Sequence, residues 1–134
     1  MIESAMRQLV VRALKPLHAL SVENPTHPGT PDINYVGGWI ELKSTSDWPA
    51  RAATLFRCEH FTPQQRIWLT RRCAAGGRAD LLFSVGREWF CMNGVSAAEH
   101  LGKTTRSQLL DQVDCFWERT PTSEELLTCF QVEI

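Results

Sequence analysis

The sequence predicts a single α/β domain in which helices flank a mixed β-sheet. Three observations support this prediction. The chain has 134 residues, the usual size of one domain, so a second large domain is excluded. An amphipathic helical pattern opens the chain, and two β-rich runs meet at Gly37-Gly38. Further strand-like runs lie near the middle of the chain.

The first predicted element is an amphipathic helix over residues 2–17. Its apolar residues recur at steps of three and four and therefore form one stripe: Ile2, Met6, Leu9, Val10, Ala13, Leu14 and Leu17. After a short apolar stretch at 19–22, the Pro- and Gly-rich segment 24–31 predicts a loop. Such a loop lets the backbone come close to a neighbour.

Residues 32–36 and 39–43 predict a β-hairpin with a two-residue turn at Gly37-Gly38. This turn sets the cross-strand pairs as Val36 with Trp39, Tyr35 with Ile40, Asn34 with Glu41, Ile33 with Leu42, and Asp32 with Lys43. Ile33, Tyr35, Ile40 and Leu42 then form a core face, whereas the charged residues share the opposite face. In this register Asp32 and Glu41 are diagonal neighbours, roughly 7 to 8 Å apart.

Asp32, Glu41 and Lys43 on one sheet face suggest a metal site. Burial of unpaired charge is costly, and a divalent cation would remove the repulsion between the two carboxylates. Hard oxygen ligands suit Mg²⁺ or Mn²⁺. The alternative is a solvated sheet edge with a simple Asp32–Lys43 pair and a free Glu41.

The later part of the chain predicts a second helix, two strands and two short helices. Thr62, Pro63 and Gln65 fit a capping box that starts a helix reaching about residue 75, with Ile67 and Trp68 facing inward. Gly76-Gly77 ends this helix. Runs 79–85 and 88–92 read as strands that complete a mixed sheet, and 95–101 and 123–130 read as short helices.

Charge is distributed unevenly although the net charge is only −1. Residues 51–87 hold seven arginines and two acidic residues, whereas 104–134 hold two arginines and six acidic residues. Arginine suits phosphate oxygens, so the middle segment is compatible with contact to nucleic acid. An ordinary solvated surface explains the same pattern equally well.

Several classes of protein are not indicated. The five cysteines are widely spaced and form no CxxC motif, so neither a disulfide framework nor a zinc knuckle is expected. No apolar run approaches the ~20 residues of a membrane span, and the start of the chain does not resemble a signal peptide. We therefore expect a cytoplasmic protein without membrane contact.

Pro31-Asp32 followed by Glu41-Leu42-Lys43 resembles the PD-(D/E)xK signature of the restriction-endonuclease-like superfamily. With Gly29-Thr30, Thr62-Pro63-Gln64-Gln65 and Gly76-Gly77, the order is similar to that of VRR-NUC-type and archaeal Holliday-junction-resolvase-like nucleases, including small phage-encoded ones. The resemblance implies an αβββαβ core with a mixed central sheet flanked by helices. It covers about 1–92 of one domain spanning 1–134 and leaves the acidic extension 93–134 unexplained.

The resemblance also implies roles for individual residues. Asp32, Glu41 and the main-chain carbonyl of Leu42 would hold Mg²⁺ or Mn²⁺, and Lys43 would steady the attacking water or the phosphate charge. Glu3 corresponds to an acid that many relatives place near the metal. The helix dipole equally favours a glutamate in a first turn, so both explanations of Glu3 stay open.

A glutamine in the helix after the third strand faces the active site in similar nucleases. Gln65 fits this position, with Gln64 as the alternative if the frame is shifted by one. The capping box alone also explains Gln65.

The leading hypothesis is a Mg²⁺-dependent DNA endonuclease of repair or recombination that selects DNA structure (a junction, flap or end) rather than sequence. Phosphate contacts would come from Arg51, Arg57, Arg66, Arg71 and Arg72. The alternatives are a non-cleaving nucleic-acid-binding or assembly module with the same fold, and a small enzyme acting on a phosphorylated molecule. Junction resolution would require a homodimer, whereas a flap or end nuclease can act as a monomer.

Overall fold

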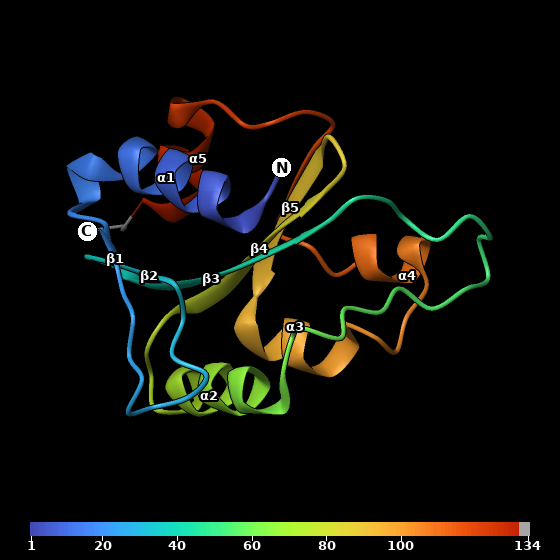
Figure 1. The fold of residues 1–134 in the computed structure, drawn as a ribbon, viewed down its shortest axis with the longest axis horizontal. Helices are drawn as coiled ribbons and strands as arrows, with labels where there is room; N and C mark the ends of the chain where they lie inside the picture. The colour runs from blue at the N-terminus through green and yellow to red at the C-terminus, as the bar shows by residue number, and fades with distance from the viewer. Residues whose placement is uncertain (132–134) are drawn as a thin grey trace.

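The computed structural model describes residues 1–131 and contains a six-stranded mixed sheet between two layers of helices (Figure 1). The α/β class expected from the sequence is therefore confirmed. The helices are α1 Glu3–Ala13, the 3-10 helix η1 Lys15–Leu17, α2 Pro63–Ala74, α3 Gly94–His100, α4 Arg106–Leu110 and α5 Ser123–Phe130. The strands are β1 Leu20–Ser21, β2 Ile33–Tyr35, β3 Gly38–Thr45, β4 Ala79–Val85, β5 Glu88–Asn93 and β6 Cys115–Trp117.

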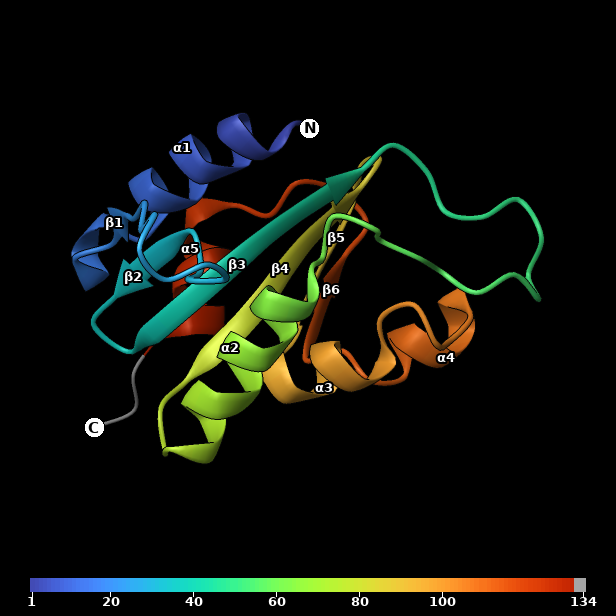
Figure 2. The ribbon, with the colours of Figure 1, turned by 60° about the horizontal axis from the view of Figure 1, so that its bottom comes forward.

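The strands lie side by side in sequence order, from β1 to β6. Neighbouring strands are antiparallel except β3 and β4, which are parallel. A parallel pair needs a long crossover, and here it consists of loop 46–62 and helix α2 (Figure 2). The crossover brings α2 onto the sheet beside β3 and β4.

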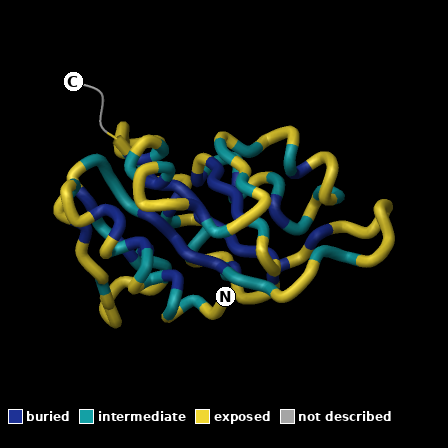
Figure 3. The backbone as a smooth tube through the Cα atoms, turned by 90° about the horizontal axis from the view of Figure 1, so that it is seen from above, coloured by how far each residue is buried: buried dark blue, intermediate teal, exposed yellow. Residues whose placement is uncertain are grey.

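Each face of the sheet has its own apolar core. Helices α1 and α5 cover one face, where Met6, Val10 and Phe130 are fully buried against the strands. Helices α2 and α3 cover the other face, with Leu69 and Ala97 packed on the sheet. Figure 3 shows the resulting buried path along the central strands. Within residues 1–131, no helix has the length and apolar character required to cross a membrane.

The predicted hairpin register is wrong by two residues. The observed pairs are Ile33 with Ile40, Asn34 with Trp39 and Tyr35 with Gly38, so the turn consists of Val36-Gly37. Gly38 pairs with Tyr35 at the start of β3, and only glycine fits there because a Cβ would clash with the Arg78 carbonyl oxygen. Because a strand has period two, the shift keeps every side chain on its predicted face. The core face of Ile33, Tyr35, Ile40 and Leu42 is accordingly buried.

Residues 93–130 form part of the same fold. Strand β6 pairs with β5, and α5 contributes the fully buried Leu126 and Phe130 to the core beneath α1. The predicted helix 123–130 is confirmed, and the predicted helix 95–101 lies within one residue of α3. Strands β1 and β6 and helix α4 had not been predicted. The C-terminal extension therefore completes the sheet and its core.

Candidate active site

The candidate residues meet where β3 runs on beyond the start of β2. Asp32 directly precedes β2, and continuing the observed register places it opposite Glu41. Glu41 and Lys43 lie on the face of the sheet that α2 covers, together with Trp39. Glu3 approaches from the first turn of α1. Four of the predicted site residues are thus brought together at one edge of β3.

Asp32 is held by two hydrogen bonds from opposite sides. Its Oδ1 lies 2.6 Å from a guanidinium nitrogen of Arg7, and its Oδ2 accepts the main-chain N–H of Leu42 at 2.8 Å. The predicted cross-strand pair with Lys43 is therefore replaced by a pair with Arg7. A carboxylate offers about four acceptor positions, so Asp32 keeps acceptor capacity for a further ligand.

Glu41 is the most unusual group of the site. Its side chain is only 2% exposed, and Oε1 lies 3.1 Å from Nζ of Lys43. Among the described residues, Oε2 is buried and has no hydrogen-bond partner. Burial, and then the negative charge of Asp32, raise the pKa of Glu41 to about 8, although Lys43 opposes this shift. A buried acceptor without a partner costs free energy, so this oxygen calls for an explanation.

Lys43 and Glu3 form the outer part of the site. Nζ of the buried Lys43 is 3.9 Å from Oε1 of Glu3, whose Oε2 lies 3.3 Å from Nε2 of His60. The Ser44 hydroxyl donates to the main-chain carbonyl of Met1, which fixes the start of α1 against β3. Glu3 therefore both occupies the helix N-terminus and reaches the site. His60 lies beside Glu3 on the outer side of the site.

The donor set can be tested against Mg²⁺. In the described chain, no three His, Cys, Asp or Glu side chains gather into a metal-holding group. Mg²⁺ does not need such a cage, because it binds one or two carboxylates and keeps several waters. The free Oε2 of Glu41 and the spare positions on Asp32 supply two carboxylates. The Leu42 carbonyl faces the same side as its N–H, which donates to Asp32. These donors fit a hard divalent cation.

Gln65 is observed in the capping box of α2. Its side-chain oxygen accepts the N–H of Thr62 at 2.9 Å, while the Thr62 hydroxyl accepts the N–H of Gln65 at 3.2 Å. The predicted capping box is therefore confirmed, and the side-chain oxygen of Gln65 is used in it. Gln64 is exposed and points to a groove on the outer side of α2.

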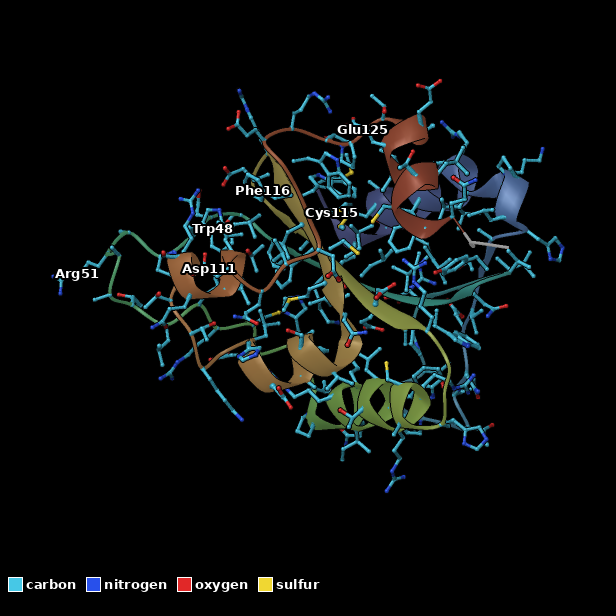
Figure 4. All side chains as sticks on the ribbon, turned by 180° about the vertical axis from the view of Figure 1, so that it is seen from behind. Trp48, Arg51, Asp111, Cys115, Phe116 and Glu125 are labelled. Atoms are coloured by element: carbon cyan, nitrogen blue, oxygen red, sulfur yellow. The ribbon has the colours of Figure 1, made fainter. Side chains whose placement is uncertain are left out.

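The five candidate arginines do not form one patch. Arg51 lies at the outer end of the long loop after β3, far from the sheet (Figure 4). Trp48 anchors this loop, since its indole N–H donates to Glu88 at 2.6 Å. Arg66 donates to the Ala98 carbonyl at 2.9 Å, so it packs α2 against α3. The remaining three are exposed on the loop or on α2: Arg57, Arg71 and Arg72.

Arg7 is a partner of the site that had not been predicted. A signal was present, because Arg7 follows Glu3 by four residues and the two therefore share one face of a helix. The sequence does not show that this face meets Asp32, since that depends on how α1 crosses the sheet.

The comparisons with known proteins add no further assignment: no protein-family model matches this chain, and no curated protein matches it.

Proposed function

We propose that this chain is a Mg²⁺-dependent deoxyribonuclease with a restriction-endonuclease-like core. The observation that carries the proposal is the buried, unpartnered Oε2 of Glu41 beside Asp32 and Lys43. A carboxylate held in this way is suited to a divalent cation, and a lysine next to it is suited to a phosphate. The DNA substrate would be selected by its structure.

The order of the elements supports the same proposal. Helix α1 is followed by the antiparallel strands β1, β2 and β3, then by α2 and by β4, which is parallel to β3. This is the αβββαβ order that the PD-(D/E)xK resemblance implies. The pattern Pro31-Asp32 and Glu41-Leu42-Lys43 falls at the edge of β3, where such a site would be expected.

The proposed mechanism assigns each residue a task. Asp32, Glu41 and the Leu42 carbonyl would hold Mg²⁺, and the chemistry supplied by such an ion would be polarisation of a phosphate and a lower pKa of bound water. Arg7 and the Leu42 N–H keep the Asp32 carboxylate oriented. Lys43 offsets the negative charge that grows on the phosphate oxygens during hydrolysis. Glu41 and Lys43 are buried on the sheet, and charges interact more strongly there than in solvent.

A cleavage panel tests the proposal. Labelled junctions, flaps, nicked duplexes and linear duplexes are incubated with Mg²⁺ or Mn²⁺ and the full chain. We expect cleavage of at least one substrate, and loss of cleavage in Asp32→Asn and Glu41→Gln with the fold retained by circular dichroism. Glu124→Gln, an exposed change on α5, is the matched control. Normal turnover in Glu41→Gln, or no cleavage of any substrate, would contradict the proposal.

One observation favours a second candidate, a DNA-binding module that does not cut. Both oxygens of Asp32 already have partners, Arg7 and the Leu42 N–H, as in a structural ion pair. Calorimetric titration with Mn²⁺ separates the two functions. A nuclease binds the ion and loses it in Glu41→Gln, whereas a binding module binds DNA but not the ion.

A further inference from the structure

A groove of about 640 Å³ lies between loop 24–30 and the outer side of α2. Trp39 of β3 lines it and precedes Glu41 by two residues on the same face of the strand, a distance of about 6–7 Å. The loop on its other side leads through Pro31 into Asp32. A strand of nucleic acid in this groove would therefore run past the candidate acids.

Aromatic and apolar side chains cover much of the groove. The rings of Trp39 and Trp68 meet edge to face, with centroids 5.2 Å apart. The guanidinium of Arg72 lies over both, 4.5 Å from the Trp68 ring and 5.5 Å from the Trp39 ring. Ile67 was expected to face inward but is 50% exposed, and Leu69 is the fully buried residue of α2. Helix α2 thus buries Leu69 in the core and turns Ile67 into the groove.

The charged side chains that line the groove are all positive. Arg71 and Arg72 are the charged residues that line it, and none of its described lining residues is acidic. Helix α2 itself contains no aspartate or glutamate. Aromatic rings interleaved with cationic groups match the chemistry of a single nucleic-acid strand, because rings stack with bases while arginines contact phosphates.

The loop wall is held in place before any ligand binds. The Asn24 side chain accepts the main-chain N–H groups of Thr26 and His27, each at 3.2 Å. The Thr30 hydroxyl donates to the His27 carbonyl at 2.7 Å. Gly29 has φ +91°, and a Cβ there would lie 2.5 Å from the Gln64 carbonyl oxygen, so the loop packs tightly on α2. A preformed wall lowers the entropic cost of binding.

We propose that this groove binds unpaired nucleotides of the DNA strand next to the scissile phosphate. The inference rests on the proposed function, since it takes Asp32 and Glu41 as the place of cleavage. In a duplex the base faces are stacked on one another, and proteins reach only base edges and the backbone. Two indole rings gain stacking energy only from bases that are unpaired. The substrates would be flaps, frayed ends and borders between single strands and duplex.

Binding measured without cleavage tests this inference. The full chain, with Ca²⁺ in place of Mg²⁺, is titrated into a labelled single strand of about 12 thymidines, within the usual site size, and into a blunt duplex of equal length. We expect the single strand to bind more tightly. Ile67→Glu places a carboxylate among the groove's apolar side chains and close to the bound phosphates, so it should weaken single-strand binding roughly 10-fold, which corresponds to about 1.4 kcal/mol.

Thr70→Glu is the matched control, because Thr70 is exposed on the same helix and lies outside the groove. It adds the same charge and should change the affinity less than about 3-fold, the range of a surface charge. Equal losses in both variants, no loss in Ile67→Glu, or tighter binding of the blunt duplex would overturn the inference.

A second pair of variants tests whether the ring of Trp68 stacks with a base. Trp68→Phe keeps a ring for stacking, whereas Trp68→Ala removes it, and thermal melting shows first that both are folded. We expect Trp68→Phe to retain most of the single-strand affinity and Trp68→Ala to lose it. Equal affinities in the two variants would overturn the inference. The proposed function fails separately, if single strands bind in the groove but no substrate is cleaved with Mg²⁺ or Mn²⁺.

Discussion

The guanidinium of Arg7 lies 2.6 Å from the carboxylate of Asp32, so helix α1 takes part in the candidate site. Glu3, one turn earlier on the same helix face, reaches Lys43 and His60. Helix α1 covers one face of the sheet and also supplies two residues to the candidate site. Arg7 holds the carboxylate of Asp32, and Glu3 adds a further carboxylate.

Arg7→Gln should lower the free energy of unfolding of the metal-free protein by about 1 kcal/mol, the scale of a partly exposed charged hydrogen bond. The loss should shrink when Ca²⁺ is added, because a bound cation replaces the lost positive charge beside Asp32. Urea denaturation with and without Ca²⁺ measures both effects. Arg12→Gln, exposed in the last turn of α1, is the control. Identical losses with and without Ca²⁺ would contradict a cation at Asp32.

The raised pKa of Glu41 should make the free energy of unfolding depend on pH. Its pKa is about 8 in the folded protein against an ordinary value of 4.5, with burial as the main cause. Between these pH values the folded state binds more protons than the unfolded state, so stability falls as pH rises. The loss amounts to several kcal/mol at most.

Thermal melting of the metal-free protein from about pH 5 to pH 8.5 checks this dependence. Glu41→Gln should flatten the pH profile and raise the melting temperature at the alkaline end. Added Ca²⁺ should stabilise the native protein more at the alkaline end, because a bound cation favours the ionised carboxylate. A pH profile that is the same in Glu41→Gln would show that Glu41 does not titrate in this range.

Lys43 should act on the rate of cleavage rather than on DNA binding. If its charge opposes the charge of the transition state, Lys43→Ala should slow single-turnover cleavage about 100-fold or more and weaken binding much less. Lys103→Ala, an exposed lysine outside the site, should change neither. Lost affinity with an unchanged rate would make Lys43 a phosphate anchor instead.

Two arginines of α2 should behave differently in salt. The logarithm of the DNA-binding constant falls linearly with the logarithm of the salt concentration, and each phosphate contacted contributes about −0.9 to the slope. Arg71 is exposed, so Arg71→Ala should flatten this slope by about one unit. Arg66 donates to the Ala98 carbonyl and covers the Phe61 ring, so Arg66→Ala should lower stability and leave the slope unchanged. The reverse outcome would contradict these placements.

Cys115 and Cys129 should form a disulfide on mild oxidation. Their Sγ atoms are 3.4 Å apart, and Figure 4 shows Cys115 beneath α5. Side-chain hydrogen bonding with Cys91 and Cys115 lowers the pKa of the Cys129 thiol although burial opposes this shift, so Cys129 should act as the attacking thiolate. With a disulfide such as oxidised glutathione as the oxidant, the closed loop should stabilise the protein by up to about 3 kcal/mol. Peptide mapping under non-reducing conditions identifies the pair, and a bond through Cys58 or Cys73 would contradict it.

The sequence predicted those features that depend on local periodicity. The faces of the hairpin followed from the alternation of Ile33, Tyr35, Ile40 and Leu42, and the start of α2 followed from its capping box. The register could not be predicted, because Gly38 is required where β3 passes the Arg78 carbonyl, a contact between residues distant in sequence. The site function of Gln65 stays a prediction.

Features that depend on tertiary contacts were missed. Strand β6, Cys115–Trp117, has only three residues, which are too few for a strand pattern to be recognised in the sequence. The ion pair of Arg7 with Asp32 depends on how α1 crosses the sheet. Ile67 lies outside the core because the groove, rather than the sheet, faces that side of α2.

The parallel pairing of β3 with β4 has a consequence for the order of folding. Trp39 pairs with Ala79, so the whole crossover must close before this contact forms, whereas β4 and β5 join through a short turn at Gly86. Contacts between distant residues form slowly, because the entropy of loop closure is lost before they are made. Glu41 and Lys43 lie on β3, so we expect the candidate site to reach its final geometry only after this late step.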